Sequence, residues 1–207
     1  MTKKRSVQDV PIFLDSRLFV ELQSLVELKG WPYKTQRELY WMRDNALICF
    51  LILTGLRVSE ALMVHRNQLR VYSDRIILRS ARTLKGGLTR EKVTLPKQGN
   101  LAYFTRVFEK WLNRVEGEDS YVFPSGGYNG FRWNRKLSRY RAHRIVKDKT
   151  GKFPHWFRGV CETIYGRLVF KSDAWKLKQF MGLKRLDSTS PYVKGSWEED
   201  EHRIFEV

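Results

Sequence analysis

The sequence predicts a mainly α-helical fold with one small antiparallel β-sheet, which places it in the α+β class. Long stretches carry apolar residues at helical spacing, above all at about 37–53 and at 101–115. Two short runs rich in strand formers, 75–78 and 92–95, lie on either side of a pair of glycines, as in a β-hairpin. The chain has 207 residues, 42% of them hydrophobic, which allows one large domain or a main domain with a small appendage.

The first elements predicted are three helices. Residues 15–29 have apolar side chains at helical spacing, and Gly30 ends this helix. The second helix, at about 37–53, is strongly apolar and ends at Gly55. A third, short helix is predicted at 59–64, before the two strands of the hairpin.

Helical patterns resume after the predicted hairpin. The stretch 101–115 is amphipathic, and 131–147 places apolar side chains along one side of a helix. Two further helices are predicted at 155–169 and 172–181, and Gly182 ends the last one. The predicted fold is therefore helical apart from the hairpin sheet.

The charge of the chain is strongly basic. Lysine and arginine outnumber aspartate and glutamate by 39 to 22, which gives a net charge of +17 and a pI near 10.1. An excess of this size on a folded domain predicts a polyanionic partner, and nucleic acid is the first candidate. An anionic membrane surface is the second candidate, but no Lys-rich amphipathic anchor stands out.

The cations are densest in the predicted helix 131–147, which holds seven of them and has no acid before Asp148. A solvated helix face would normally mix in acids, so we favour contact with a DNA backbone over that alternative. The residues assigned to this contact are Arg132, Arg135, Lys136 and Arg139.

Several classes of protein are disfavoured. Cys49 lies in an apolar run, which predicts a buried thiol more strongly than a disulfide. Two cysteines and four scattered histidines do not make a zinc site, and we expect no metal or cofactor. The start of the chain lacks the features of a signal peptide, and no apolar run approaches the about 20 residues of a membrane span. We expect an intracellular protein, in the cytoplasm or nucleoid of a host cell, that is not secreted.

The segment 54–60 carries the strongest chemical signal. It closes the apolar second helix with Gly55 and places Arg57 at the start of the next helix. A guanidinium offers donors in a fixed fork that matches two phosphate oxygens. The alternative is an arginine paired only with Glu60, three residues further on. We favour phosphate contact, with Glu60 as a support that aims the guanidinium.

Three further features have chemical content. His155 and Arg158 are three residues apart, so on a helix they share a face and can reach one anion, although a surface pair is the simpler alternative. Lys85 lies at the tip of the predicted hairpin, where ordinary lysines are common. Tyr192 follows an irregular stretch, and a tyrosine there has little meaning alone.

The order of these residues along the chain resembles that of the tyrosine recombinases, the phage integrase family, over about residues 10–193. Residues 54–62 (TGLRVSEAL) resemble the first arginine box of the family, and 83–87 (TLKGG) with 90–96 (REKVTLP) resemble its lysine hairpin. Residues 155–158 (HWFR) match its His-x-x-Arg box, and the nine-residue spacing from Leu183 to Tyr192 is that of its nucleophile.

This resemblance implies the catalytic-domain fold of tyrosine recombinases and a phosphotyrosine mechanism. Tyr192 would attack phosphorus, Arg57 and Arg158 would offset the added charge with His155 as a further donor, and Lys85 would protonate the departing 5′ oxygen. One departure concerns Leu183, which stands where the family usually has a second His or a Trp. A leucine cannot donate, so Lys184 or Arg185 is predicted to supply the missing contact.

The resemblance also sets the predicted organisation. Residues 1–195 would form the catalytic domain, with about ten flexible residues at its start and no separate N-terminal domain to close around DNA. The acidic tail 196–207 is either a disordered end or a segment that docks on a neighbouring protomer.

The predicted function is site-specific recombination of double-stranded DNA, as in a viral, plasmid or phage-type integrase, with the protein assembling from dimer to tetramer on synapsis. Integration, excision and resolution would use the same residues. The alternatives are a DNA-binding module that has lost catalysis and a topoisomerase-like activity that nicks and rejoins DNA.

Overall fold

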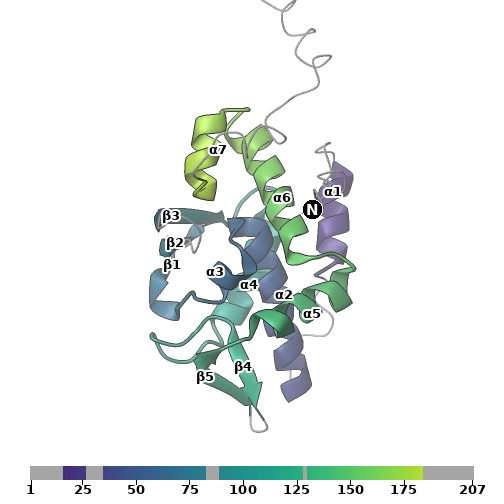
Figure 1. The fold of residues 1–207 in the computed structure, drawn as a ribbon, viewed down its shortest axis with the longest axis vertical. Helices are drawn as coiled ribbons and strands as arrows, with labels where there is room; N and C mark the ends of the chain where they lie inside the picture. Colours follow the sequence, from purple (N-terminus) through teal and green to yellow (C-terminus); the bar gives the residue numbers. More distant parts are fainter. Residues whose placement is uncertain (1–15, 27–34, 83–88, 128–129, 184–207) are drawn as a thin grey trace, which may run out of the picture.

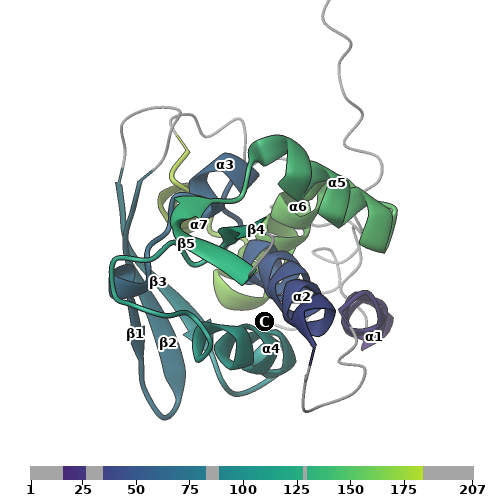
Figure 2. The ribbon, with the colours of Figure 1, turned by 90° about the horizontal axis from the view of Figure 1, so that it is seen from below.

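One long helix forms the centre of the molecule. The computed structural model describes residues 16–26, 35–82, 89–127 and 130–183. Helix α2 (Gln36–Thr54) lies between α1 (Ser16–Ser24), α4 (Ala102–Leu112) and α6 (Pro154–Ile164), as Figure 2 shows in a view along α2. The three-stranded sheet lies along one side of the molecule and α1 on the other, and the β4–β5 hairpin lies at the end away from α7 (Figure 1).

The sequence of α2 explains its central place. Thr35 caps its start: its Oγ1 accepts from the Glu38 N–H at 3.3 Å, and the Glu38 carboxylate accepts from the Thr35 N–H at 2.7 Å. Every residue from 45 to 54 is buried, as expected for a helix that is apolar on all sides. Gly55 ends the helix in the left-handed conformation, with φ of 60°. The predicted helix and its end are confirmed.

The hairpin sheet is also confirmed, with one strand more than predicted. Strands β2 (Arg75–Arg82) and β3 (Thr89–Pro96) are antiparallel, with Ile76 opposite Leu95. The additional strand β1 (Leu69–Val71) pairs with β2 and is too short to give a period-two pattern. A single 3₁₀ turn, at 66–68, leads into it.

The predicted helix at 131–147 is wrong in its first half. Residues 130–136 form strand β5 (Gly130–Lys136), which pairs antiparallel with the unpredicted strand β4 (Pro124–Gly127). In β5 the half-buried Phe131 and Trp133 alternate with exposed neighbours, which is the period of a strand. The helix starts only after this strand.

That helix is α5 (Arg139–Thr150), which Ser138 caps by accepting the N–H of Arg141 at 3.2 Å. The side chain of Tyr140 is 73% exposed, and Ala142 and Val146 are the buried positions of this helix. Arg132, Arg135 and Lys136 therefore lie on a strand, and only Arg139 lies on the helix.

The remaining helices follow the predictions with changed ends. Helix α4 confirms the stretch 101–115, and α1 confirms the described part of 15–29. The short helix α3 (Val58–Ala61) is one turn instead of the predicted 59–64. Helix α6 continues as a π-helical turn (Tyr165–Val169), and α7 (Ala174–Met181) ends at the left-handed Gly182 as predicted.

The core forms around α2. Phe50 stacks on Phe108 of α4 with ring centroids 4.8 Å apart, and Phe123 lies 5.4 Å from Phe50. Both cysteines, Cys49 and Cys161, are buried free thiols, in agreement with the prediction for Cys49. None of the described helices has the length and apolar composition needed to cross a membrane.

Candidate active site and an adjoining basic cavity

The loop after α2 holds Arg57 in place through Glu60. The Arg57 backbone N–H donates to Glu60 Oε2 at 2.8 Å, and Nη1 of its guanidinium lies 3.0 Å from Oε1. The Glu60 side chain is buried, whereas the Arg57 side chain stays 31% exposed. One carboxylate therefore fixes both the start of α3 and the direction of the guanidinium, and the guanidinium keeps access to solvent.

Arg158 lies beneath this loop and ties it to two helices. Its Nη1 donates to the Gly55 carbonyl at 2.5 Å, its Nη2 to the Met181 carbonyl at 3.2 Å, and its Nε lies 3.1 Å from Glu162 Oε1. Burial lowers the pKa of Arg158, and Glu162 partly offsets this effect. The nearby charge of Arg57 lowers the same pKa further, so the two arginines share one electrostatic environment.

A third arginine, which the sequence analysis did not single out, also holds this loop. Arg90 of β3 is buried, and its Nη1 donates to the Thr54 carbonyl at 2.7 Å. Its guanidinium lies over the ring of Phe180, 4.5 Å from the centroid, and burial lowers its pKa to about 10. Its Nε and Nη2 have no hydrogen-bond partner among the described residues. Arg90 and Arg158 thus hold two consecutive carbonyls at the end of α2.

His155 lies in the first turn of α6, directly after Pro154. Its side chain is exposed, whereas Arg158 one turn later is buried. Both project from the same helix, which also contacts α2. The structure therefore brings Arg57 and Arg158 together and places His155 at the exposed start of the helix that carries Arg158.

Four predicted site residues lie outside the described residues: Lys85, Lys184, Arg185 and Tyr192. The structure does describe Leu183. It packs against the core, and its N–H donates to the Lys178 carbonyl at 3.0 Å, directly after the end of α7. Leu183 thus contributes apolar packing at the position where the family usually has a donor.

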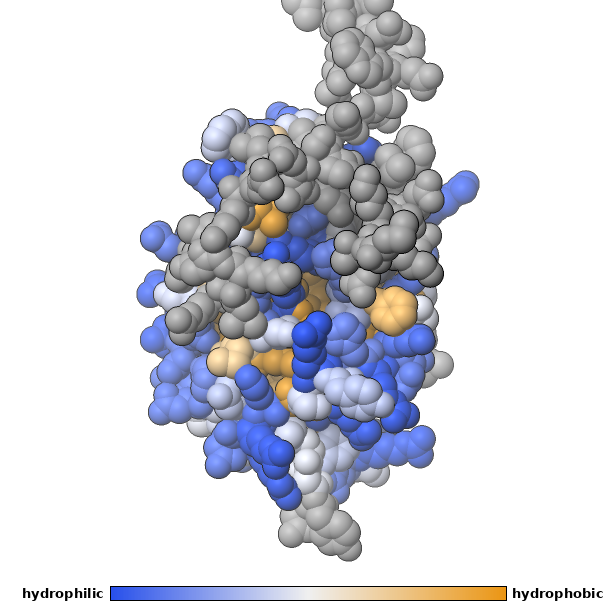
Figure 3. Space-filling view, viewed as in Figure 1, coloured by the Kyte–Doolittle hydropathy of each residue, from blue (hydrophilic) through white to orange (hydrophobic). Residues whose placement is uncertain are grey.

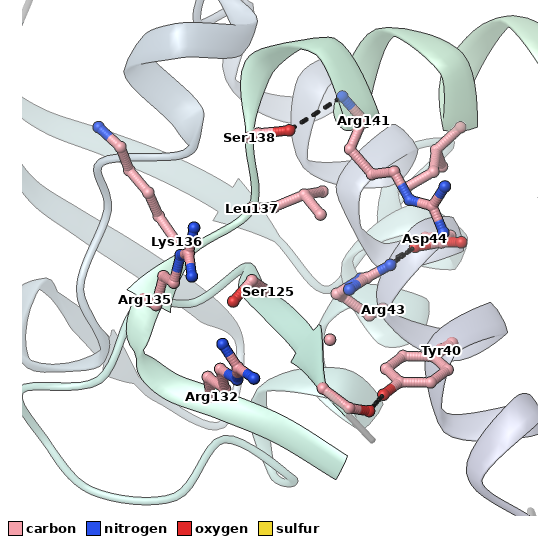
Figure 4. A pocket seen from close by; sticks show the side chains of 13 residues that line it. Tyr40, Arg43, Asp44, Ser125, Arg132, Arg135, Lys136, Leu137, Ser138 and Arg141 are labelled. Atoms are coloured by element: carbon pink, nitrogen blue, oxygen red, sulfur yellow. Dashed lines mark hydrogen bonds and ion pairs between the residues drawn. The ribbon is translucent and has the colours of Figure 1, made fainter. Parts of the chain in front are cut away.

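Three of the four residues predicted to contact DNA line one cavity, of about 570 Å³, between α2, the β4–β5 hairpin and the start of α5 (Figure 4). These residues are Arg132, Arg135 and Lys136; Arg139 is exposed nearby but does not line it. Arg141, one of the seven cations of the predicted basic run, also lines it, and so does Arg43, which sequence reasoning missed. Arg43 lies within the apolar α2, where its position gave no sign of a surface role.

The cavity adjoins the Arg57 loop. Lys136 Nζ lies 2.7 Å from the sulfur of Met63, two residues after the end of α3, and α3 also contacts α5. Hydrophilic residues cover most of the face that carries α3, α5 and the β4–β5 hairpin, with small apolar areas between them (Figure 3). The basic lining of the cavity therefore lies next to the segment that follows the Arg57 loop.

Comparison with known families decides the identity of this arrangement. A model of the phage integrase family matches residues 33–198, which includes every described element from α2 onward. The chain belongs to the phage integrase family, that of the tyrosine recombinases. No sequence among curated proteins matches this phage integrase family member significantly.

Solved structures of tyrosine recombinases share the fold. XerA recombinase matches with a TM-score of 0.63 and 17% identity, over 100% of this chain and 66% of its own. XerH bound to difH substrate matches with a TM-score of 0.62 and 16% identity, over 93% of this chain and 53% of its own. A lambda integrase dimer bound to a COC′ core site gives 0.54 and 13%, over 87% and 47%. This phage integrase family member spans about half to two thirds of the length of these proteins.

Proposed function

We propose that this protein is a site-specific DNA recombinase that cleaves and rejoins DNA strands through a covalent 3′-phosphotyrosine intermediate. The observation that carries the proposal is the pair Arg57 and Arg158. One guanidinium is partly exposed and aimed by a buried carboxylate, and the other is buried directly beneath the same loop. Such fixed cations stabilise charge that develops on non-bridging phosphate oxygens without reorganising during the reaction.

The reaction would take place in two steps, strand cleavage and strand rejoining. The phenol oxygen of Tyr192 bonds to phosphorus as the bond to the 5′ oxygen breaks, and Lys85 gives a proton to that leaving oxygen. A phenol has a pKa of about 10, so it needs a base or strong local positive charge, and His155 is the proposed base. Rejoining reverses the step with the 5′ hydroxyl of another strand. Arg57, Arg158 and His155 offset the phosphorane charge in both directions.

Double-stranded DNA is the proposed substrate. The basic cavity beside α3, with Arg132, Arg135 and Lys136, and the nearby Arg139 supply cations for the duplex backbone. Related folds support this assignment, because XerH is bound to difH substrate and lambda integrase is a dimer on its COC′ core site. We extend the proposal to self-association on DNA, from dimer to tetramer, in which the acidic tail 196–207 docks on a neighbouring protomer.

A DNA-binding module without catalysis is the second candidate, and Leu183 favours it. In the proposed enzyme, Lys184 or Arg185 takes the place of the donor that a leucine lacks.

A nicked suicide duplex separates the two functions, because it traps any covalent protein–DNA product. The enzyme gives a band that survives SDS, forms in EDTA and is lost in Tyr192→Phe. Intact DNA binding with no covalent band would support the module, and a strict Mg²⁺ requirement would contradict the mechanism. Relaxation of plasmid without a target site would support a topoisomerase-like activity.

A further inference from the structure

The cavity beside α5 has an imbalance of charge. Among the described residues that line it, Asp44 supplies the one carboxylate. Against it stand five cations: Arg43, Arg132, Arg135, Lys136 and Arg141. Cations gathered in a concave site repel one another unless an anion is present, so the lining indicates a negatively charged occupant.

The single carboxylate is already engaged. Asp44 Oδ1 accepts from Nε of Arg43 at 2.9 Å and from its Nη2 at 2.6 Å. Nη1 of Arg43 donates to the Pro124 carbonyl at 3.1 Å, and the guanidinium lies 5.3 Å from the centroid of Tyr40. The buried Arg43–Asp44 pair therefore forms a wall of the cavity that is close to neutral.

Arg141 acts on the same carboxylate, because its charge partly offsets the rise that burial causes in the pKa of Asp44, but Arg132 and Arg135 have no such partner among the described residues. In the described part of the chain, no carboxylate forms an ion pair with the guanidinium of Arg132 or Arg135. Figure 4 shows both of these side chains, with Lys136, on the β5 side of the cavity, across from Arg43 on α2. Two free guanidinium forks facing one space can bind the non-bridging oxygens of a single phosphate.

Two uncharged features point to the same occupant. Ser125 Oγ is buried and has no hydrogen-bond partner among the described residues, although its residue lines the cavity. Helix α5 begins at the cavity with its cap Ser138, and its twelve residues give a positive helix end there. A free hydroxyl donor and a helix N-terminus both favour an anion with several acceptor oxygens.

We propose that this cavity is a binding site for one phosphodiester of the DNA backbone, separate from the phosphate that is cleaved. The cavity adjoins α3 through the contact of Lys136 with Met63. A DNA strand that binds at Arg57 therefore has this second phosphate-binding site next to it. The inference rests on the proposed function only for the identity of the polyanion as DNA. It does not require the protein to cleave that DNA.

The test uses the salt dependence of binding to a nonspecific 20-bp duplex, which counts the phosphates that the protein neutralises. Each phosphate contributes about 0.9 to the slope of log K against log salt. If Arg132 and Arg135 share one phosphate, the double variant Arg132→Gln/Arg135→Gln lowers the slope by about 0.9, and the two single affinity losses are not additive. Arg106→Gln, on the exposed side of α4 and outside the cavity, is the charge-matched control. Adding it should not change the affinity loss that Arg132→Gln or Arg135→Gln causes.

A second variant leaves the cations of the cavity in place and fills part of the phosphate-binding site. Ser125→Val suits a strand and places methyl groups at the buried hydroxyl, so we expect about threefold to tenfold weaker DNA binding with an unchanged melting temperature. Ser73→Val, in the exposed turn between β1 and β2, is the matched control.

Three results would contradict the proposed phosphate-binding site. They are additive affinity losses of the Arg132 and Arg135 variants with a slope change of about 1.8, unaltered DNA binding by Ser125→Val, or inorganic phosphate that binds the cavity without competing with the duplex. Loss of covalent adduct with these binding results intact would instead contradict only the proposed function.

Discussion

The guanidinium of Arg158 holds the carbonyl of Gly55, with Nη1 and the oxygen 2.5 Å apart. Gly55 ends α2 and lies two residues before Arg57, so this contact joins the candidate phosphate-binding arginine to α6. Arg90 holds the preceding carbonyl, of Thr54, at 2.7 Å. Two buried arginines on separate elements, Arg158 of α6 and Arg90 of β3, therefore fix the backbone just before Arg57. These contacts make the loop as rigid as the core.

Arg158→Lys should weaken both the fold and the reaction. A single ammonium keeps the charge but cannot donate to Gly55, Met181 and Glu162 in the same geometry. Breaking a buried charged network typically costs about 3–5 kcal/mol, and we expect a loss toward the lower end because the charge is retained. Urea unfolding measures this loss, and the rate of adduct formation should fall at least about a hundredfold. Wild-type stability in the variant would show that the three contacts contribute little.

Gly55→Ala should be far more harmful than Gly151→Ala. Both glycines end helices with positive φ, 60° and 70°, so both substitutions carry the same backbone strain. A Cβ at Gly55 would lie 2.7 Å from Met181 Cε and 2.9 Å from Cys161 Sγ, whereas the space at Gly151 is open. We expect a loss of about 1 kcal/mol for Gly151→Ala and about 2–4 kcal/mol for Gly55→Ala, measured by urea unfolding. Equal losses would mean that the close packing at Gly55 relaxes without cost.

Glu60→Gln should separate positioning from stability. The amide oxygen of a glutamine can still accept the Arg57 backbone N–H, but the charge beside its guanidinium is lost. Because the Arg57 side chain is partly exposed, the ion pair is worth less than about 1 kcal/mol of stability. Adduct formation should nevertheless slow about tenfold, because Arg57 is no longer aimed. An unchanged rate would remove Glu60 from the site, and Glu60→Asp, with its shorter reach, serves as the comparison.

Arg90→Met should leave stability unchanged or raise it, while it slows cleavage. Burial lowers the pKa of Arg90 to about 10, and two of its nitrogens have no partner among the described residues, so its charge is costly to the fold. Among the described residues, the one hydrogen bond of its guanidinium joins β3, the second strand of the hairpin, to the end of α2. Thermal melting and adduct formation test the two effects separately, and Arg90→Lys should restore part of the rate. A parallel loss of stability and rate would mean that Arg90 is only structural.

The two thiols should be unreactive in the native protein. Burial raises the pKa of Cys161 from 9.0 to about 12, and raises that of Cys49 as well. The thiolate fraction of Cys161 at pH 8 is then about a thousandfold smaller than in the unfolded chain. Because the folded pKa is the higher one, the contribution of the Cys161 thiol to the free energy of unfolding is complete below pH 9. It is lost as the pH rises through about 12. Fast labelling by a thiol reagent at pH 8 without denaturant would contradict the buried placement.

The sequence predicted the parts of the fold that depend on local signals. Helix α2 could be placed because a long apolar run ends at Gly55 along one stretch. The hairpin could be placed because β2 and β3 are strand formers on either side of glycines. The pair of Arg57 and Glu60 was expected from spacing, and the structure shows the contact, although the catalytic role of the pair stays a prediction.

The misses arise where tertiary contacts decide. Residues 130–136 carry a helix-like pattern but form a strand, because β4 offers them a partner and Phe131 and Trp133 pack on Trp111. Arg90 and Arg43 are buried cations with roles that no local spacing shows, since their partners are 36 and 81 residues away. Their contacts are set by the packing of separate elements, which a single sequence does not display.

The identity of the residue that joins DNA tests the central claim most directly. After reaction with a nicked suicide duplex in EDTA, tryptic digestion and mass spectrometry should find a 3′-phosphate of the DNA on the peptide 186–194, which contains Tyr192. The same peptide from Tyr192→Phe should carry no DNA. A linkage to a 5′ phosphate, an adduct on any other residue, or bound DNA without any adduct would contradict the proposed recombinase mechanism.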